Sequence, residues 1–227
     1  MHLSTNRKYH SARVVYGFTQ VEFDTLSEFK TIVVFDHAPA KFKDGIRNKA
    51  NVETLDCLIL DVDNVEGEEI TIVDFIEMFK KYEMLIYTSR NHQKIKELGG
   101  GKFAEARDRF HVVFPIGKDV TSTEYEIIAK SFVERFDFFD KACVDSSRFF
   151  FGNKEAEVFR NNGEFIEIPE DQKEDFEPDF VPFHVFENDY TQYNQNCREK
   201  IRPRRSWLSN RNQRSGSRSI DSCRCRF

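Results

Sequence analysis

Residues 55–63 read Leu-Asp-Cys-Leu-Ile-Leu-Asp-Val-Asp, and this stretch decides the fold prediction. A run of apolar residues ends in two aspartates, Asp61 and Asp63. Because side chains alternate between the two faces of a strand, both carboxylates are predicted to point the same way. Two such carboxylates repel each other unless a cation lies between them, and hard divalent cations prefer oxygen ligands. The stretch predicts a core strand ending in a metal site, and it favours an enzyme that acts on phosphates.

The plainer interpretation of the two aspartates is a strand end whose carboxylates are solvated in a turn with Asn64. The pattern does not favour a calcium-binding loop. Read from Asp61, the segment lacks an oxygen ligand at its fifth position and glycine at its sixth.

Length and composition favour a folded domain followed by a tail. The chain has 227 residues and 24 phenylalanines, many of them in apolar runs. No stretch is long enough for a membrane span, and the first residues lack the apolar stretch of a secretory signal. The five cysteines do not have the spacing of a disulfide framework. We therefore expect a cytoplasmic protein without a membrane partner, in which Cys57 and Cys143 are reduced core residues.

Charge is unevenly distributed along the chain, whose net charge is −5. Residues 164–189 are acidic, and residues 198–226 are rich in arginine, serine and asparagine. We expect a catalytic domain over residues 1–170, an acidic and aromatic linker over 171–197 that can pack on it, and a basic, disordered tail over 198–227. The tail is either simply solvated or touches phosphates without specificity.

Hydrophobic periodicity predicts strands at residues 12–23, 30–35, 55–63, 84–87, 109–116, 156–160 and 163–168. Helices are predicted at residues 70–82 and at 121–138, where Thr121 to Glu124 can cap the first turn. Residues 40–53 and the glycine-rich residues 93–106 are predicted to be loops, with solvated lysines and arginines in the first. This order indicates an α+β domain with one sheet backed by helices.

A third carboxylate, Asp145, precedes the aromatic segment Phe149-Phe150-Phe151. On its own it is typical of a turn aspartate beside Ser146 and Ser147. If the fold brings it beside the first two aspartates, the three acids complete a site for two cations that activate an attacking oxygen and stabilise a leaving one.

Cationic and hydrogen-bonding groups occur in the segments between these acids. Ser89, Arg90 and His92 follow the strand at 84–87, and Arg109 and His111 share one face of the strand at 109–116. Such groups facing a metal site are what a triphosphate needs. The alternative for Arg109 and His111 is a partly exposed strand face. Arg148 either joins them or pairs with an acid.

Four segments together resemble the archaeo-eukaryotic primase superfamily, in particular the small primase-polymerase domains of phages and plasmids. They are Leu-Asp-Cys-Leu-Ile-Leu-Asp-Val-Asp-Asn, Ile-Tyr-Thr-Ser-Arg-Asn-His-Gln, Arg-Phe-His-Val-Val-Phe-Pro-Ile and Val-Asp-Ser-Ser-Arg-Phe-Phe-Phe-Gly. The resemblance covers residues 10–168. The order and separation of the four segments are far more specific than any one of them. The resemblance implies an RRM-like primase-polymerase core with a mixed or antiparallel sheet backed by helices.

The resemblance also implies roles for residues of this chain. Asp61, Asp63 and Asp145 are the metal-binding and catalytic acids, holding two Mg²⁺ or Mn²⁺ ions. The family's phosphate-binding histidine matches His111, although Arg109 stands where a small residue is more usual, and His92 competes for the role. Ser89, Arg90, Arg109 and Arg148 complete the nucleotide-binding set. No zinc site is expected, since Cys223 and Cys225 alone supply too few ligands.

The activity that the resemblance implies is that of a DNA primase or primase-polymerase, in the replication of a phage, plasmid or virus. Its substrates are nucleoside triphosphates and a single-stranded DNA template. A replicative helicase is a candidate partner, because the chain lacks the Gly-x-x-x-x-Gly-Lys-Ser loop of a helicase. Such a chain could also be one part of a larger primase-helicase.

Two other functions fit part of the pattern. A phosphatase of the haloacid dehalogenase type also has an Asp-x-Asp strand end, with Asp61 as a covalent nucleophile, followed by a strand ending in Thr or Ser. That class needs a later lysine and a Gly-Asp pair before further acids, and no convincing version of the pair is present. The other alternative is a catalytically inactive replication-initiator module that binds DNA.

Overall fold

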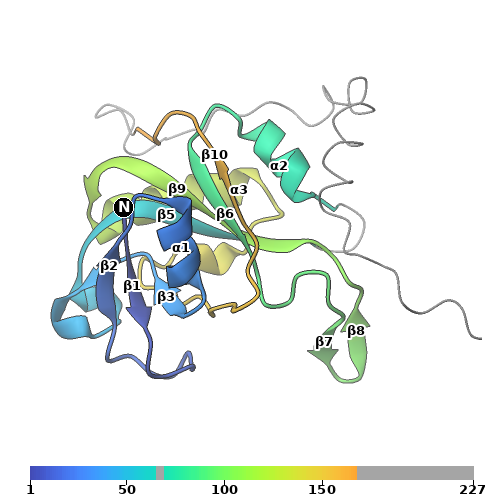
Figure 1. Cartoon of the computed structure of the whole chain (residues 1–227), viewed down its shortest axis with the longest axis horizontal. Helices are drawn as coiled ribbons and strands as arrows, with labels where there is room; N and C mark the ends of the chain where they lie inside the picture. The colour runs from blue at the N-terminus through green and yellow to red at the C-terminus, as the bar shows by residue number, and fades with distance from the viewer. Residues whose placement is uncertain (65–68, 168–227) are drawn as a thin grey trace, which may run out of the picture. The chain divides into compact units, whose positions relative to one another are not determined.

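The computed structural model of the protein describes residues 1–64 and 69–167, all within one unit, Met1–Phe183 (Figure 1). The central sheet has five strands in the order β10 (Val158–Asn161), β6 (Met84–Thr88), β9 (Arg109–Val120), β5 (Val52–Asp63) and β4 (Lys41–Phe42). Every neighbouring pair in it is antiparallel. The prediction of an α+β fold with a mixed or antiparallel sheet backed by helices is confirmed.

Two smaller sheets accompany the central one. The first has the order β2 (Thr19–Glu22), β1 (His2–Asn6) and β3 (Asp36–Ala38), and the second is the hairpin of β7 (Lys96–Gly99) and β8 (Lys102–Ala104). The α-helices are α1 (Leu26–Val33), α2 (Ile72–Met78) and α3 (Ser122–Arg135), and the 3-10 helices are η1 (Lys43–Gly45), η2 (Lys49–Asn51) and η3 (Lys141–Val144). Among the described residues, none of the helices has the length and apolar character needed to cross a lipid bilayer.

The central sheet is covered on both faces, which explains the nearly continuous apolar runs of β5, β6 and β9. On one face, Phe114 of β9 contacts Phe79 beside α2 and Phe132 of α3, with ring centroids 5.9 and 5.4 Å apart. On the other face, Tyr87 of β6 contacts Phe29 of α1 at 5.7 Å. Alternation along β9 therefore places Phe114 on the α2–α3 face and His111 on the opposite face.

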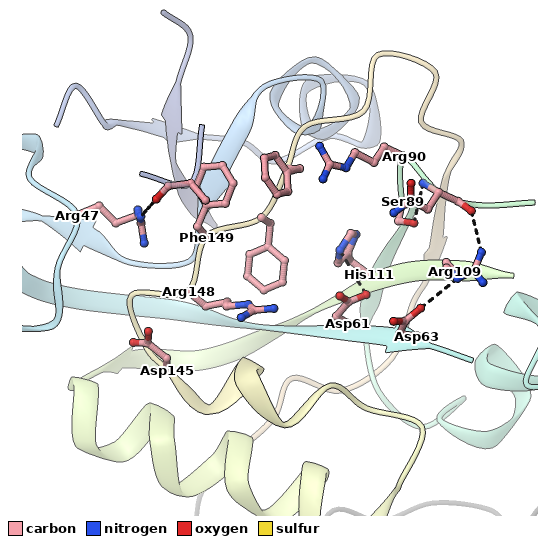
Figure 2. Close-up of a pocket in the computed structure, with 14 residues that line it drawn as sticks. Arg47, Asp61, Asp63, Ser89, Arg90, Arg109, His111, Asp145, Arg148 and Phe149 are labelled. Carbon is pink, nitrogen blue, oxygen red and sulfur yellow. Dashed lines mark hydrogen bonds and ion pairs between the residues drawn. The ribbon is translucent and has the colours of Figure 1, made fainter. Parts of the chain in front are cut away.

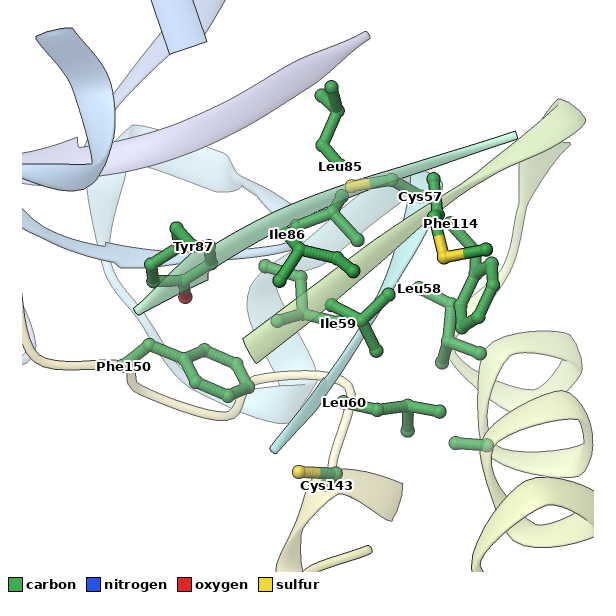
Figure 3. Close-up of a cluster of buried hydrophobic side chains, with 14 of the residues drawn as sticks. Cys57, Leu58, Ile59, Leu60, Leu85, Ile86, Tyr87, Phe114, Cys143 and Phe150 are labelled. Carbon is green, nitrogen blue, oxygen red and sulfur yellow. The ribbon is translucent and has the colours of Figure 1, made fainter. Parts of the chain in front are cut away.

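The core is built from the three central strands and the segments that pack on them (Figure 3). Leu58, Ile59 and Leu60 of β5 are fully buried, as are Ile86 of β6 and Val113 of β9. Cys57 and Cys143 are buried and unpaired, as predicted. A core filled this completely fixes the ends of β5, β6 and β9, and those ends carry the polar side chains described below.

Several predicted elements are confirmed with shifted ends. The helix expected at 121–138 is α3, with Thr121 and Glu124 forming a capping box, and the helix expected at 70–82 is the shorter α2. The strands expected at 55–63, 84–87, 109–116 and 156–160 are β5, β6, β9 and β10.

Other predicted elements are wrong. Residues 30–35 lie mostly in α1, because a capping box of Thr25 and Glu28 starts a helix before the β-branched run Thr-Ile-Val-Val. In the strand expected at 12–23, only Thr19–Glu22 is a strand, and β1 precedes it. The loop expected at 93–106 contains the β7–β8 hairpin, whose turn has Gly100 and Gly101 at positive φ. Residues 163–167 form only isolated bridges.

The predicted linker and tail, residues 171–227, lie outside the described residues. The predicted domain boundaries at residues 170 and 197 therefore stay predictions.

Candidate active site

A cavity of about 350 Å³ opens at the ends of β5, β6 and β9 and is closed on one side by residues 145–151 (Figure 2). Eight of the nine predicted site residues line it: Asp61, Asp63, Ser89, Arg90, Arg109, His111, Asp145 and Arg148. His92 does not. The segments that sequence analysis singled out are thus brought together by the fold, although they span almost ninety residues.

Asp61 and Asp63 lie on one face of β5, as strand alternation predicts, and both line the cavity. The β5–β9 register places Asp61 opposite His111 and Asp63 opposite Arg109. The distances are 3.4 Å from His111 Nε2 to Asp61 Oδ1 and 3.0 Å from Arg109 Nε to Asp63 Oδ1. Their side chains are 23 % and 43 % exposed, so both carboxylates are reachable from solvent.

The backbone of Asp61 is fixed by the segment that leads to the third predicted acid. Its N–H donates to Cys143 Sγ at 3.2 Å, and its carbonyl accepts from the N–H of Asp140 at 2.9 Å. The 3-10 helix η3 is therefore docked on the end of β5, and the residues that follow it form one wall of the cavity.

Arg109 is only 3 % exposed, and most of its donors are used within the protein. Besides Asp63, its guanidinium donates to the carbonyls of Asn91, Lys94 and Glu105 at 3.0–3.1 Å. This geometry ties the segment after β6 to the end of β5 and orients Asp63. The role of Arg109 as a phosphate ligand stays a prediction, and the contacts in the structure are those of a positioning residue.

His111 lies against aromatic rings at the floor of the cavity. It stacks on Tyr87 with ring centroids 4.6 Å apart and meets the edge of Phe150 at 5.3 Å. Burial, reinforced by the nearby charge of Arg148 and opposed by Asp63, lowers the pKa of His111 from 6.5 to about 3. A neutral imidazole leaves the charge of Asp61 available to a cation. Its Nδ1 is buried without a hydrogen-bond partner in the described part of the chain.

Asp145 lines the cavity but does not join the first two acids. Its Oδ1 accepts from the N–H of Ser147 at 2.9 Å and from Ser147 Oγ at 2.8 Å, which is the turn geometry considered from the sequence. Figure 2 shows it apart from Asp61 and Asp63, with the Arg148 side chain drawn between them. Within residues 1–64 and 69–167, no group of three or more His, Cys, Asp or Glu side chains is close enough to hold one metal ion.

The cationic wall of the cavity contains Arg90 and Arg148. Arg148 donates to Asp140 Oδ2 at 2.8 Å, while its Nε is buried without a partner among the described residues. Arg90 is exposed, with its guanidinium 3.6 Å from the centre of the Phe151 ring, and no described carboxylate forms an ion pair with it. Both arginines therefore keep hydrogen-bonding capacity for an anion.

His92 lies outside the cavity lining and contacts the chain just before β9 and its first residue. Its Nδ1 accepts from the N–H of Arg109 at 3.3 Å, and its Nε2 lies 3.8 Å from Asp108 Oδ1. The histidine that faces the cavity is His111. The sequence left the two alternatives open, because both lie close to the end of a strand.

The prediction that Arg47, in the loop at residues 40–53, is solvated charge is wrong, and the alternative, contact with template or nucleotide, stays a prediction. Arg47 lines the cavity and donates to the carbonyls of Ser147 and Ala12 at 3.0 and 2.8 Å. Its guanidinium lies 5.3 Å from the centre of the Phe149 ring. No local signal marks this residue, because its partner Ser147 is 100 positions away.

The carboxylates of the cavity can be compared with what a divalent cation requires. Asp61 and Asp63 present carboxylate oxygens to the same open space, and Mg²⁺ is commonly held by one or two carboxylates together with substrate phosphates. These two residues fit such an ion. The arrangement of three acids around two ions, with Asp145 as the third, is not assembled in the described residues.

Comparison with known proteins gives one family. The profile of the family described as the VapE N-terminal domain matches residues 17–167. That segment contains every cavity-lining residue except Ala12, and it lies within residues 10–168, over which the four sequence segments resemble primase-polymerase domains. A search of curated protein sequences finds no match.

Among solved structures, the AEP domain of the cyanophage S-2L primase-polymerase is similar to this chain. The TM-score is 0.40 with 12 % sequence identity, over 73 % of this chain and 83 % of that one.

Proposed function

Because this chain belongs to the VapE N-terminal domain family, we propose that it is a primase-type nucleotidyltransferase that joins nucleotides on a single-stranded DNA template. The observation that carries the proposal is the cavity itself, where Asp61 and Asp63 face Arg90 and Arg148. A carboxylate pair opposite arginines suits a ligand that brings phosphates together with a divalent cation.

In the proposed reaction, the 3′-hydroxyl oxygen of one nucleotide attacks the α-phosphorus of a nucleoside triphosphate. The bond from that phosphorus to pyrophosphate breaks, and the hydroxyl proton leaves to solvent. Mg²⁺ or Mn²⁺, when bound, would neutralise phosphate charge and lower the pKa of the attacking hydroxyl.

The residues of the chain have distinct parts in this proposal. Asp61 and Asp63 hold the cation, and Arg109 keeps Asp63 in place through their 3.0 Å contact. Arg148 and Arg90 bind the phosphates, since both line the cavity and Arg90 forms no ion pair with a described carboxylate. Neutral His111 has a single N–H, and because its Nε2 lies 3.4 Å from Asp61 Oδ1, we assign His111 to orienting that carboxylate. Its role as a phosphate ligand stays a prediction. Ser89, which also lines the cavity, adds a hydroxyl.

Asp145 is the third acid in the resemblance, and its role is the least supported by the geometry. Its carboxylate accepts two hydrogen bonds from Ser147. We therefore assign cation binding to Asp61 and Asp63, and the variant Asp145→Asn tests whether a third acid takes part. A replicative helicase stays a predicted partner.

The phosphatase alternative is weakened by the cavity lining. That class needs a lysine near the nucleophile, and the lining drawn from residues 1–64 and 69–167 includes arginines but no lysine. The inactive DNA-binding alternative is separated from the proposal by the experiment below.

The test is incubation of the full chain with a single-stranded DNA template, ribo- or deoxyribonucleoside triphosphates, and Mg²⁺ or Mn²⁺, with products separated on a denaturing gel. We expect template-dependent synthesis, lost in Asp61→Asn and Asp63→Asn. The matched control Asp119→Asn removes an exposed carboxylate from the same strand pair, outside the cavity lining, and should retain synthesis. Hydrolysis of a phosphomonoester without synthesis would support the phosphatase instead. DNA binding with neither activity would support the inactive module.

A further inference from the structure

The loop between β1 and β2, residues 7–18, is a cationic and aromatic surface at the edge of the cavity. Its sequence is Arg-Lys-Tyr-His-Ser-Ala-Arg-Val-Val-Tyr-Gly-Phe, which contains three permanent cations and no acid. This composition contrasts with a chain whose net charge is −5. A local positive patch on an acidic protein indicates an anionic partner.

The three cations of the loop, Arg7, Lys8 and Arg13, are exposed. None of them forms an ion pair with a described carboxylate. Arg7 and Lys8 instead lie over the rings of Phe35 and Tyr9, each at 5.2 Å from the ring centre. Their charge is therefore not neutralised within the described part of the chain, and it remains available to phosphate.

A neighbouring acid does not cancel this charge. Asp36 lies 3.7 Å from His10 in the loop, but it is only 2 % exposed. Its Oδ1 accepts from the N–H of Gly152 at 2.8 Å. This carboxylate is directed into the protein, so an incoming strand does not meet it at the surface.

Hydrogen bonds hold the loop in one shape. Asn6 accepts from the N–H groups of Lys8 and Tyr9 through Oδ1 and donates through Nδ2 to the carbonyl of Tyr16. The rings of Tyr9 and Tyr16 meet edge to face at 5.5 Å. A surface that is ordered before binding loses less entropy when a ligand arrives.

The loop is continuous with the cavity through Arg47. This arginine donates to the carbonyl of Ala12, and both residues line the cavity. Figure 2 shows Arg47 and Phe149 at one end of the cavity, while Asp63 and Arg109 lie at the other. A strand bound along the loop would therefore reach the cavity at the end marked by Arg47.

Tyr16 adds an exposed aromatic ring to the charged loop. Its side chain is 55 % exposed, and the neighbouring Val15 is 42 % exposed. Exposed aromatic rings among cations are the usual platform for single strands, because unpaired bases stack on them whatever their sequence. A duplex keeps its bases stacked inside and cannot use such a ring.

We propose that residues 7–18 bind the backbone and bases of single-stranded nucleic acid and guide it to the cavity at Arg47. This inference rests on the proposed function for the identity of the strand as template. Binding by the loop is measurable without synthesis, so the two claims can fail separately.

The test is fluorescence anisotropy of a labelled 20-nucleotide oligothymidylate with the full chain, in EDTA, from 0.05 to 0.3 M salt. The variant Arg7→Gln/Lys8→Gln/Arg13→Gln should lower the salt dependence, d log K/d log[salt], by about 2, at ~0.7 for each phosphate that is no longer neutralised. By the same relation, affinity at 0.1 M salt should fall about a hundredfold. The matched control Lys80→Gln/Lys81→Gln/Lys130→Gln changes charge equally at exposed sites after α2 and on α3 and should keep both values.

A second pair of variants separates stacking from charge. Tyr16→Leu should weaken binding about fivefold or more, while Tyr16→Phe keeps the ring and should bind like the wild type. A duplex of equal length should bind more weakly than the single strand.

The inference is overturned if the triple variant keeps the wild-type salt slope, or if duplex and single strand bind equally. It is also overturned if a poly-glutamate competitor is bound as tightly as the oligonucleotide. Loss of binding in the loop variant, with no synthesis by the wild type, would leave the loop as a nucleic-acid site and refute only the proposed activity.

Discussion

Replacing Arg109 should lower the free energy of unfolding much more than replacing an arginine on the protein surface. Arg109 is 3 % exposed and donates four hydrogen bonds, one to Asp63 and three to carbonyls of the chain between β6 and β9. In Arg109→Met the three carbonyls lose a charged donor, and the buried methionine cannot replace it.

The expected loss of stability in Arg109→Met follows from these contacts. The Asp63 carboxylate is 43 % exposed, so its pairing with Arg109 is screened and contributes only ~0–1 kcal/mol. Hydrogen bonds from a charged donor contribute ~1.5–3 kcal/mol each, and water entering the loop recovers part of that loss. We expect the free energy of unfolding to fall by about 3–5 kcal/mol, because three hydrogen bonds from a charged donor are lost and water replaces only part of them.

The assay is urea denaturation followed by far-ultraviolet circular dichroism. With a slope of ~2 kcal/mol/M, the midpoint should shift by about 2 M. The control is Arg160→Met, which removes an arginine whose side chain is 36 % exposed and paired with Glu83 at 2.6 Å, and which should cost ~0–1 kcal/mol. Equal midpoint shifts in the two variants would refute the positioning role of Arg109.

Three further predictions concern the packing around the cavity. Gly152→Ala should destabilise the protein by about 1–3 kcal/mol in thermal melts, because its Cβ would lie 2.5 Å from the backbone of residues 34–35. Gly117→Ala, whose nearest contact is a side chain at 3.7 Å, should melt like the wild type, and equal melting of the two variants would contradict this account. Tyr87→Phe should lower the free energy of unfolding by about 1–3 kcal/mol, because it leaves the buried Nε2 of His37 without the Tyr87 hydroxyl 2.6 Å away. An unchanged midpoint of urea denaturation would contradict the importance of that hydrogen bond. Burial lowers the pKa of His37 from 6.5 to about 4. As the pH falls, the imidazole is therefore protonated in the unfolded chain at a higher pH than in the folded protein. Stability should therefore rise between pH 4 and 6.5, by up to ~3 kcal/mol from this residue, and His37→Gln should reduce the rise measured by urea titration.

The sequence located the elements that carry the site because their patterns are strong. Three patterns each predict a single kind of element: the apolar run ending at Asp63, the alternation around His111 and the capping box at Thr121. The structure has β5, β9 and α3 at these positions. Strand alternation also put Asp61 and Asp63 on one face correctly.

What the sequence could not show depends on tertiary contacts. Strand β1 consists largely of polar residues, yet its five residues are buried between β2 and β3. The β-branched run Thr31 to Val34 suggested a strand, but the capping box before it and the burial of Phe29 and Ile32 favour a helix. The inward direction of Arg47 depends on Ser147, and the contact of Asp145 with Ser147 instead of the other acids depends on a turn conformation.

We propose that Asp61 and Asp63 support nucleotidyl transfer in this cavity. The most direct measurement is the rate of pyrophosphate release with a single-stranded template, nucleoside triphosphates and Mn²⁺, in the wild type and in Asp61→Asn/Asp63→Asn. We expect release that depends on the template and falls about a thousandfold in the variant, equivalent to ~4 kcal/mol of transition-state stabilisation. Template-dependent release at an equal rate in both proteins would contradict the claim.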